Sequence, residues 1–233
     1  LYNVDCLEFM AGLPDKSYDL CICDPPYGIG GGDYGDGQSE KRRLSAGTLE
    51  KLRKTDYDTI RPNAAYFAEV LRVSRNCIIW GGNHFADMLP ATAGWVVWDK
   101  QIAEGLSLSD CELAWTNIGG RVAKYTQMWA GVWKKGEMGL KRIHPNQKPV
   151  ALYRWLLQNY AKPGQKILDT HGGSMSIAIA CDIEGYDLDL CELDKDYFEA
   201  GKKRLEQHQA QPRMFDAPKA SESVQLTLDG PAT

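Results

Sequence analysis

The sequence predicts an α/β fold with a largely parallel sheet. Segments that read as buried strands alternate with segments of helical periodicity, the pattern typical of such sheets. Two expected strands, Tyr18–Cys23 and Lys166–Asp169, lead directly into turns rich in proline or glycine. With 233 residues, 43% hydrophobic and 25% charged, the chain has the length and composition of one ordinary globular domain.

The expected elements follow in order along the chain. A short strand, a helix and the strand at 18–23 come first, then a helix over 64–73 and strands at 77–80 and 95–98. Residues 99–142 show little periodicity and predict an inserted or irregular region. The order then returns with helices over 149–161, 175–185 and 197–209 and strands at 166–169 and 187–192. Residues 210–233, rich in Pro, Ala, Ser and Gln, predict a flexible tail.

Composition narrows the environment and the partners. None of the seven cysteines forms a C-x-x-C pair, which predicts free thiols in a reducing, cytoplasmic compartment. No apolar run approaches the roughly 18 residues of a membrane helix, so we expect no membrane partner. His84 and His144 lack the spacing of metal ligands, so we assign no metal. A net charge of −4 argues against nucleic-acid binding over the whole surface but allows a local basic face.

The first chemical motif is a strand, a Gly-rich turn and a helix that begin at Asp169. Glycines allow a ligand to approach the backbone, and the start of the helix supplies free N–H groups. About 20 residues later, Glu192 follows another strand, where a carboxylate can accept hydrogen bonds from ribose hydroxyls. The pair indicates a nucleoside cofactor without choosing between a dinucleotide and S-adenosylmethionine. A tight strand–helix turn with a surface acid is the structural alternative.

The second motif, Asp24-Pro-Pro-Tyr27, stands at a strand end because two prolines cannot continue a central strand. The Asp24 carboxylate and the Pro25 carbonyl can together offer two acceptors to one amino group. Tyr27 offers a flat face to a planar base. This motif therefore predicts a site that holds an exocyclic amine. A turn at a sheet edge with a stacked tyrosine is the alternative.

At these residues the chain resembles the amino-group DNA methyltransferases that use S-adenosylmethionine, most closely the small adenine-specific enzymes of phages and prophages. Asp24-Pro-Pro-Tyr27 resembles their catalytic motif, usually D-P-P-Y in adenine enzymes and often S-P-P-Y in cytosine-N4 enzymes. Residues 167–174 (ILDTHGGS) resemble the cofactor loop, 191–205 the strand that carries the ribose acid and the next helix, and 144–149 (HPNQKP) the H-P-T-Q-K-P element. The catalytic motif precedes the cofactor loop, which is the β-class order.

The resemblance implies a Rossmann-like methyltransferase fold in which the strands ending at Asp24 and Asp169 are neighbours. It divides the chain into a catalytic half (1–98), a target-recognition region (99–142) and a cofactor half (143–209). The catalytic residues it implies are Asp24, Pro25, Pro26 and Tyr27. The cofactor-binding residues it implies are Asp5, Cys6, Asp24, His144, Gln147, Lys148, Asp169, His171, Gly172, Gly173, Ser174 and Glu192.

The cofactor loop departs from the family pattern D-P-F-x-G-S-G. Met175 stands where the last glycine is usual, and it would weaken cofactor binding if this position needs a positive φ or close approach. Thr170 and His171 replace Pro and Phe. His171 lacks an identifiable partner, so we expect it to pack beside the cofactor rather than act as a base.

Two basic stretches are candidates for DNA contact, although runs of charge are also common on solvated faces. Residues 41–54 and 121–142 each hold six Lys or Arg and one Glu. Basic residues can neutralise phosphates, and aromatic residues can stack on bases. The DNA-binding residues we predict are Arg42, Arg43, Lys124, Tyr125, Trp129, Trp133, Lys134, Lys135 and Lys141.

The function we expect is methyl transfer from S-adenosylmethionine to the N6 amino group of an adenine flipped out of double-stranded DNA. Cytosine-N4 methylation on the same scaffold is the nearest alternative, and a catalytically silent DNA-binding regulator, favoured by Met175, is the other. The resemblance also suggests a bacterial or phage source and a homodimer. The sequence specifies neither a recognition sequence nor a partner restriction nuclease.

Overall fold

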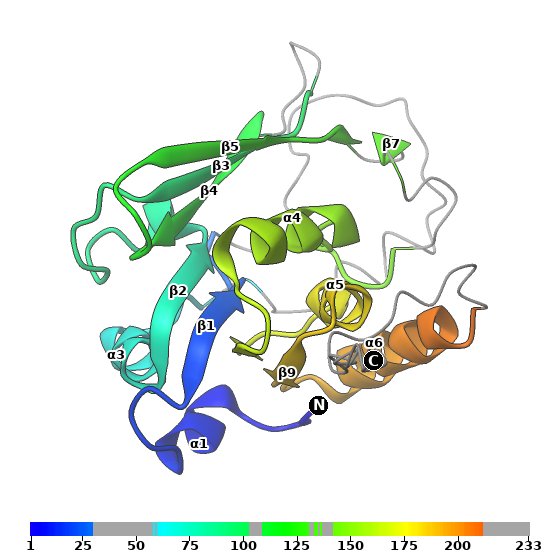
Figure 1. Cartoon of the computed structure of the whole chain (residues 1–233), viewed down its shortest axis with the longest axis horizontal. Helices are drawn as coiled ribbons and strands as arrows, with labels where there is room; N and C mark the ends of the chain where they lie inside the picture. The colour runs from blue at the N-terminus through cyan, green and yellow to red at the C-terminus, as the bar shows by residue number, and fades with distance from the viewer. Residues whose placement is uncertain are drawn as a thin grey trace, which may run out of the picture.

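The computed structural model describes residues 1–29, 58, 60–102, 109–130, 133, 134, 136 and 142–211. The stretch 41–54, with Arg42 and Arg43, lies outside these residues, as do Lys135, Lys141 and the tail from 212 onward. Seven strands form one sheet in the order β5-β3-β4-β2-β1-β8-β9 (Figure 1). Their bounds are β1 Tyr18–Cys23, β2 Ser74–Trp80, β3 Trp95–Asp99, β4 Cys111–Thr116, β5 Val122–Thr126, β8 Lys166–Asp169 and β9 Asp187–Leu190.

Helices cover both faces of this sheet, which confirms the predicted α/β class. They are α1 (Cys6–Ala11), α3 (Ala64–Val73), α4 (Val150–Tyr160), α5 (Ser176–Glu184) and α6 (Lys195–Gln209), with a short 3₁₀ turn, η2 (Gly82–His84). A two-stranded ribbon, β6 (Trp129–Ala130) and β7 (Trp133–Lys134), lies apart from the main sheet. In the described part of the chain, no helix combines the length and apolar character that crossing a membrane requires.

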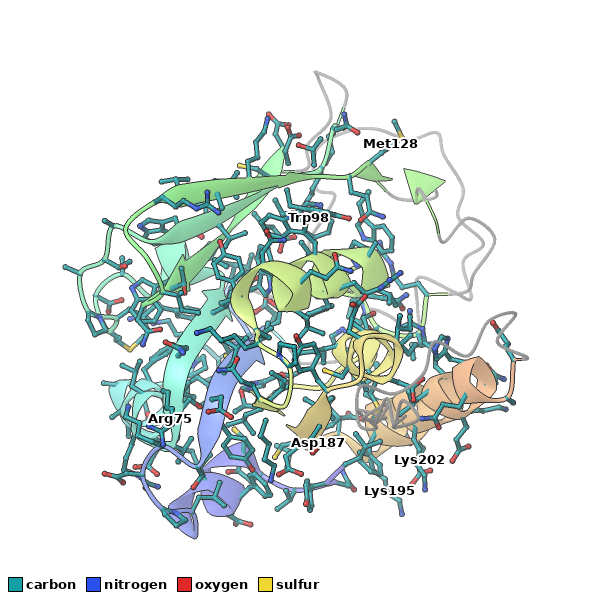
Figure 2. All side chains as sticks on the ribbon, viewed as in Figure 1. Arg75, Trp98, Met128, Asp187, Lys195 and Lys202 are labelled. Atoms are coloured by element: carbon teal, nitrogen blue, oxygen red, sulfur yellow. The ribbon has the colours of Figure 1, made fainter. Side chains whose placement is uncertain are left out.

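Alternation along the strands divides the core into two layers. Leu20 and Ile22 of β1 pack with α4 and α5, whereas Cys21 and Cys23 pack with α1 and α3. Strands that are apolar on both faces are typical of a sheet buried between helices. In Figure 2, Trp98 of β3 lies between the sheet and α4, and it is 1% exposed. All seven cysteines are free thiols, as predicted.

The direction of β4 sets it apart. β9, β8, β1 and β2 pair in parallel, and β3 pairs in parallel with β5, but β4 runs antiparallel to both β2 and β3. The predicted strands and helices elsewhere are present within a few residues of their expected bounds, except the short first strand, where only an isolated bridge joins Tyr2 to Cys191. The expectation of an irregular region over 99–142 is wrong for two segments, because β4 lies in the interior of the sheet and β5 at its edge.

Met175 has the left-handed conformation that the sequence left in question. Its φ is +54°, and it caps the start of α5. The side chain is fully buried against α6, since a Cβ atom on Gly201 would lie 2.7 Å from Met175 Cγ. The backbone strain of a non-glycine residue in this region costs about 1–2 kcal/mol. Burial of a methionine side chain contributes about 2–5 kcal/mol, so packing outweighs strain.

Met175→Gly should therefore destabilise the protein although glycine suits the backbone. We expect the free energy of unfolding, measured by chemical denaturation, to fall by about 1–3 kcal/mol. Gly185→Ala is the matched control, because Gly185 has φ +78° and open space around its Cα. It isolates the strain and should cost about 1 kcal/mol. A more stable Met175→Gly variant would contradict this account.

Candidate active site at the carboxyl edge of the sheet

The parallel strands bring acidic residues from distant parts of the sequence to one edge of the sheet. Asp24 follows β1, Asp169 ends β8, and Glu192 lies just beyond β9. β1 pairs in parallel with β8, as predicted, with Cys21 opposite Leu168. The chain continues from β1 to β2 and from β8 to β9, and these two strands lie on opposite sides of the β1–β8 pair. Such switch points are where α/β sheets bind ligands.

The antiparallel β4 adds a carboxylate that the sequence did not identify. Because β4 runs opposite to its neighbours, its beginning lies where their ends lie. Glu112, the second residue of β4, therefore reaches the same edge, opposite Trp98 of β3. Lys100, just beyond β3, lies 2.7 Å from Glu112 Oε1.

Lys148 joins these groups. Its side chain is 4% exposed, and its ammonium forms an ion pair with Asp24 Oδ2 and lies 3.1 Å from Glu112 Oε2. It also donates to the Tyr27 hydroxyl at 3.2 Å and lies 5.4 Å from the centre of the Trp80 ring. The sequence assigned Lys148 to the cofactor site. The structure places its side chain against Asp24, which the sequence assigned to both the catalytic and the cofactor-binding residues.

The Asp24-Pro-Pro-Tyr27 turn is held from two sides. Asp58 accepts hydrogen bonds from the backbone N–H groups of Tyr27 and Gly28. The Tyr27 hydroxyl donates to Asp24 Oδ1 at 2.7 Å, and its ring stacks on His84 with ring centres 5.0 Å apart.

Gly81, after β2, lies against the same ring. A Cβ atom there would come within 2.2 Å of Tyr27 Cε1, so only glycine permits this approach. Neither Asp58 nor the stacking of His84 on Tyr27 was predicted from the sequence. Pro25 is buried and Pro26 half-buried within the turn.

The predicted cofactor loop packs closely on β9 and on the segment before α4. A Cβ atom on Gly172 would lie 2.3 Å from Leu190 Cδ2, which explains that glycine. The Gly173 backbone N–H donates to Glu192 Oε2 at 2.7 Å, and the His144 ring lies against Gly173.

A second set of contacts holds the backbone of Lys148 in place. Ser176 Oγ at the start of α5 donates to the Lys148 carbonyl at 2.7 Å, and it contacts Ser174 Oγ at 3.1 Å. Arg204 of α6 donates to both Ser174 O and Ser176 Oγ at 2.8 Å. Gln147 is buried, and its side-chain oxygen accepts from the Ile143 N–H at 3.1 Å. The glycine-rich loop and Lys148 are thus parts of one hydrogen-bonded unit.

On the other face of the sheet, His171 lies against α3. Its Nδ1 lies 2.9 Å from Thr170 Oγ1, and its ring meets the Tyr66 ring edge-on. Burial lowers the pKa of His171 to about 4, so it is neutral near pH 7. Asp5 caps α1 by accepting from the backbone N–H groups of residues 7 and 8, and Cys6 is half-buried.

Burial and mutual repulsion set the charges of the site. Burial raises the pKa of Asp169 to about 8, with Asp24 and Glu192 adding to the effect. Burial also raises the pKa of Asp24, against the opposing charge of Lys148. Burial would raise the pKa of Glu112 as well, but Lys148 and Lys100 together outweigh it and lower that pKa to about 2. Burial lowers the pKa of His144 to about 3.

The predicted DNA-contact residues separate into different environments. Lys124 is exposed and lies 3.3 Å from Asp99. Tyr125 packs its ring on Trp155 of α4, and its hydroxyl donates to Gln127 at 2.7 Å. The prediction for Trp129 is wrong: it is 6% exposed, lies in the core beside Trp98, and donates to the Gln147 carbonyl at 3.1 Å.

The strand β7 contains the two remaining described candidates, Trp133 and Lys134, which pair with β6 through the backbone. The other four, Arg42, Arg43, Lys135 and Lys141, lie outside the described residues. An exposed apolar residue that the prediction omitted, Met128, lies in the connection between β5 and β6 (Figure 2) and is 40% exposed.

Comparison with known proteins gives the site a context. Residues 94–203 match the model of a family named for N6 and N4 methyltransferases and described as DNA methylase. The comparisons relate this chain to the DNA amino-methyltransferases. Among curated proteins, it is 26% identical over 211 residues to YubD of Escherichia coli (strain K12), provisionally named a methylase, covering 86% of this chain and 87% of YubD.

Solved structures of DNA methyltransferases share the fold. The M1.HpyAVI–SAM complex matches with a TM-score of 0.51 at 18% identity, over 87% of this chain and 97% of that one. The cytosine-N4-specific PvuII DNA methyltransferase matches with a TM-score of 0.53 at 14% identity, over 89% of each chain. The architecture is therefore the Rossmann-like fold of S-adenosylmethionine-dependent DNA methyltransferases.

The raised pKa of Asp169 predicts how stability depends on pH. The folded chain holds this proton up to about pH 8, whereas an unfolded chain releases it near pH 4. Stability from this group is therefore present at low pH and lost as pH rises toward 8. Asp169→Asn should match wild type near pH 5 and exceed its unfolding free energy by on the order of 4 kcal/mol at pH 8.5. Denaturation at both pH values checks this, and a gap that does not grow with pH would refute it.

Proposed function

We propose that this protein transfers a methyl group from S-adenosylmethionine to the N6 amino group of adenine in double-stranded DNA. The observation that carries the proposal is the meeting of two motifs at neighbouring strands. Asp24-Pro-Pro-Tyr27 follows β1, and the glycine-rich loop that contacts Glu192 follows β8, which is paired with β1. An amine held by one motif would therefore lie next to a cofactor held by the other.

The described residues fit S-adenosylmethionine chemically. The cofactor carries a positive sulfur, an ammonium group and ribose hydroxyls, which are favoured by hydrogen-bond acceptors and negative charge. Three acidic side chains, those of Asp24, Asp169 and Glu192, gather at the edge as hydrogen-bond acceptors, and Asp169 is protonated near pH 7 because its pKa is about 8. The Lys148 ammonium beside them is already paired. Asp5, Cys6, His144 and His171 remain predicted members of the same site. When bound, the cofactor supplies a methyl group on a sulfur that keeps the bonding electrons.

The residues of the catalytic turn would position the amine rather than activate it by proton removal beforehand. The Asp24 carboxylate and the Pro25 carbonyl accept hydrogen bonds from the amino group, so that its lone pair faces the methyl carbon. The nitrogen gains a methyl group and loses one proton, which the Asp24 carboxylate can take and pass to water. Tyr27 stacks on the flipped base and offsets part of the few kcal/mol that flipping costs. Rate enhancement then comes mainly from orientation.

Adenine is favoured over cytosine because residue 24 is an aspartate. The resemblance associates D-P-P-Y with adenine-N6 enzymes and S-P-P-Y with cytosine-N4 enzymes. Cytosine remains the second candidate, because the cytosine-N4-specific PvuII enzyme has the same fold. The feature that favoured a silent regulator, Met175, has a structural explanation in its packing on α6. The cytoplasm and a homodimeric state remain predictions.

Incubation with radiolabelled S-adenosylmethionine and unmethylated DNA, followed by nucleoside mass spectrometry, tests the proposal. N6-methyladenine is the expected product. N4-methylcytosine would correct the base and keep the reaction class. Absence of any labelled nucleoside would refute the proposed function.

Asp24→Ala should reduce methyl transfer by at least about 100-fold, because the amine loses its main acceptor. Calorimetry should show that cofactor binding changes less than about tenfold, since Glu192 and the glycine-rich loop are intact. Asp187→Ala is the matched control, because Asp187 is exposed and lies at the start of β9, away from the carboxyl edge of the sheet (Figure 2). Full activity of Asp24→Ala would contradict the assigned role.

A further inference from the structure

The carboxylate that should receive the target amine already has two partners. The Lys148 ammonium pairs with Asp24 Oδ2, and the Tyr27 hydroxyl donates to Oδ1. An ammonium is a stronger donor to a carboxylate than a neutral amine, because the hydrogen bond is charge-assisted. The amine can replace Lys148 only if the ammonium has another partner close by, since an unpaired buried charge is strongly unfavourable.

Glu112 provides that partner. Its Oε2 atom lies 3.1 Å from Lys148 Nζ and 3.4 Å from the Tyr27 hydroxyl, so it faces both groups that now contact Asp24. Its other oxygen is bound by Lys100 at 2.7 Å, which fixes the carboxylate in this orientation. Lys148 and Lys100 hold the pKa of Glu112 at about 2, so it is ionised throughout the range in which enzymes are assayed.

The surroundings of Lys148 restrict movement to the end of its side chain. Its carbonyl is held by Ser176 Oγ at 2.7 Å, and α4 begins two residues later, at Val150. The Trp80 ring lies beside the ammonium at 5.4 Å and the Tyr27 ring at 5.7 Å, so the path from Asp24 to Glu112 runs along aromatic surfaces that favour a cation.

We propose that Glu112 is a positioning residue that takes the Lys148 ammonium from Asp24 when the target amine enters. This inference rests on the proposed amino-methyl transfer and extends it to a residue of β4. Asp24 would be screened by Lys148 before the base arrives and available as an acceptor afterwards. The Lys148 ammonium stays next to a carboxylate in either arrangement, and Asp24 exchanges its ion pair for hydrogen bonds from the entering amine.

Steady-state kinetics of Glu112→Gln test whether Lys148 moves from Asp24 to Glu112. A neutral amide binds an ammonium far more weakly than a carboxylate, so Lys148 would stay on Asp24 and compete with the amine. We expect kcat to fall by roughly 10- to 100-fold with little change in KM for DNA or in cofactor binding. Glu112→Asp, which keeps the charge, should recover a large part of kcat. Glu184→Gln is the matched control, because Glu184 pairs with Arg154 away from the edge.

A second measurement separates this inference from the proposed function. The groups that face Asp24 are Lys148, Glu112, Tyr27 and Asp169, and only Glu112 changes in the variant. Removal of its negative charge should lower the pKa of Asp24 by roughly one pH unit. A ¹³C NMR titration of labelled aspartate, assigned with Asp24→Asn, reports this without any turnover.

The outcomes are distinct. A wild-type enzyme that methylates no nucleoside refutes the proposed function, whereas the titration still decides whether Glu112 acts on Asp24. An Asp24 pKa that is unchanged in Glu112→Gln overturns the inference. Wild-type kcat in that variant overturns it too, as does a loss of kcat that Glu112→Asp fails to restore.

Discussion

The burial of one ammonium group, that of Lys148, governs the chemistry of the carboxyl edge. Parallel strands gather carboxylates at this edge, and burial penalises each of their charges. Lys148 offsets this penalty for Asp24 and Glu112, which it touches, and Glu112 keeps a pKa of about 2. Asp169 forms no ion pair with it, and its pKa rises to about 8. Of these acids, Asp24 and Glu112 are therefore paired with Lys148, whereas Asp169 is protonated near pH 7.

The position of Lys148 depends on both halves of the chain. Its side chain meets Asp24 beyond β1, while Ser176 of α5 holds its carbonyl and Arg204 of α6 supports Ser176. Parallel pairing of β1 with β8 keeps the two sets of contacts in register. In the proposed reaction, Lys148 therefore connects the site of the amine to the site of the cofactor, so a structural change in one site alters the other.

The sequence was sufficient wherever local chemistry determines structure. Two prolines end β1 after Cys23, and the glycines after Asp169 mark a turn, so the position of both motifs at strand ends could be predicted. Glu112 could not be found this way, because only the reversal of β4 brings it to the edge; an acid before the apolar run 113–115 was its one signal. Trp129 misled because a tryptophan among lysines suggests a nucleic-acid surface, while its ring fills the core.

The pH dependence of stability in Lys148→Met tests the central claim most directly. Methionine fills similar space without charge, so Asp24 would be buried without a cation and could relieve the penalty only by binding a proton. Its pKa would rise further above the unfolded value, and stability would be lost as pH increases. We predict an unfolding free energy about 3 kcal/mol below wild type at pH 8.5, with the gap narrowing toward pH 5. A gap that is equal at both pH values would contradict the account.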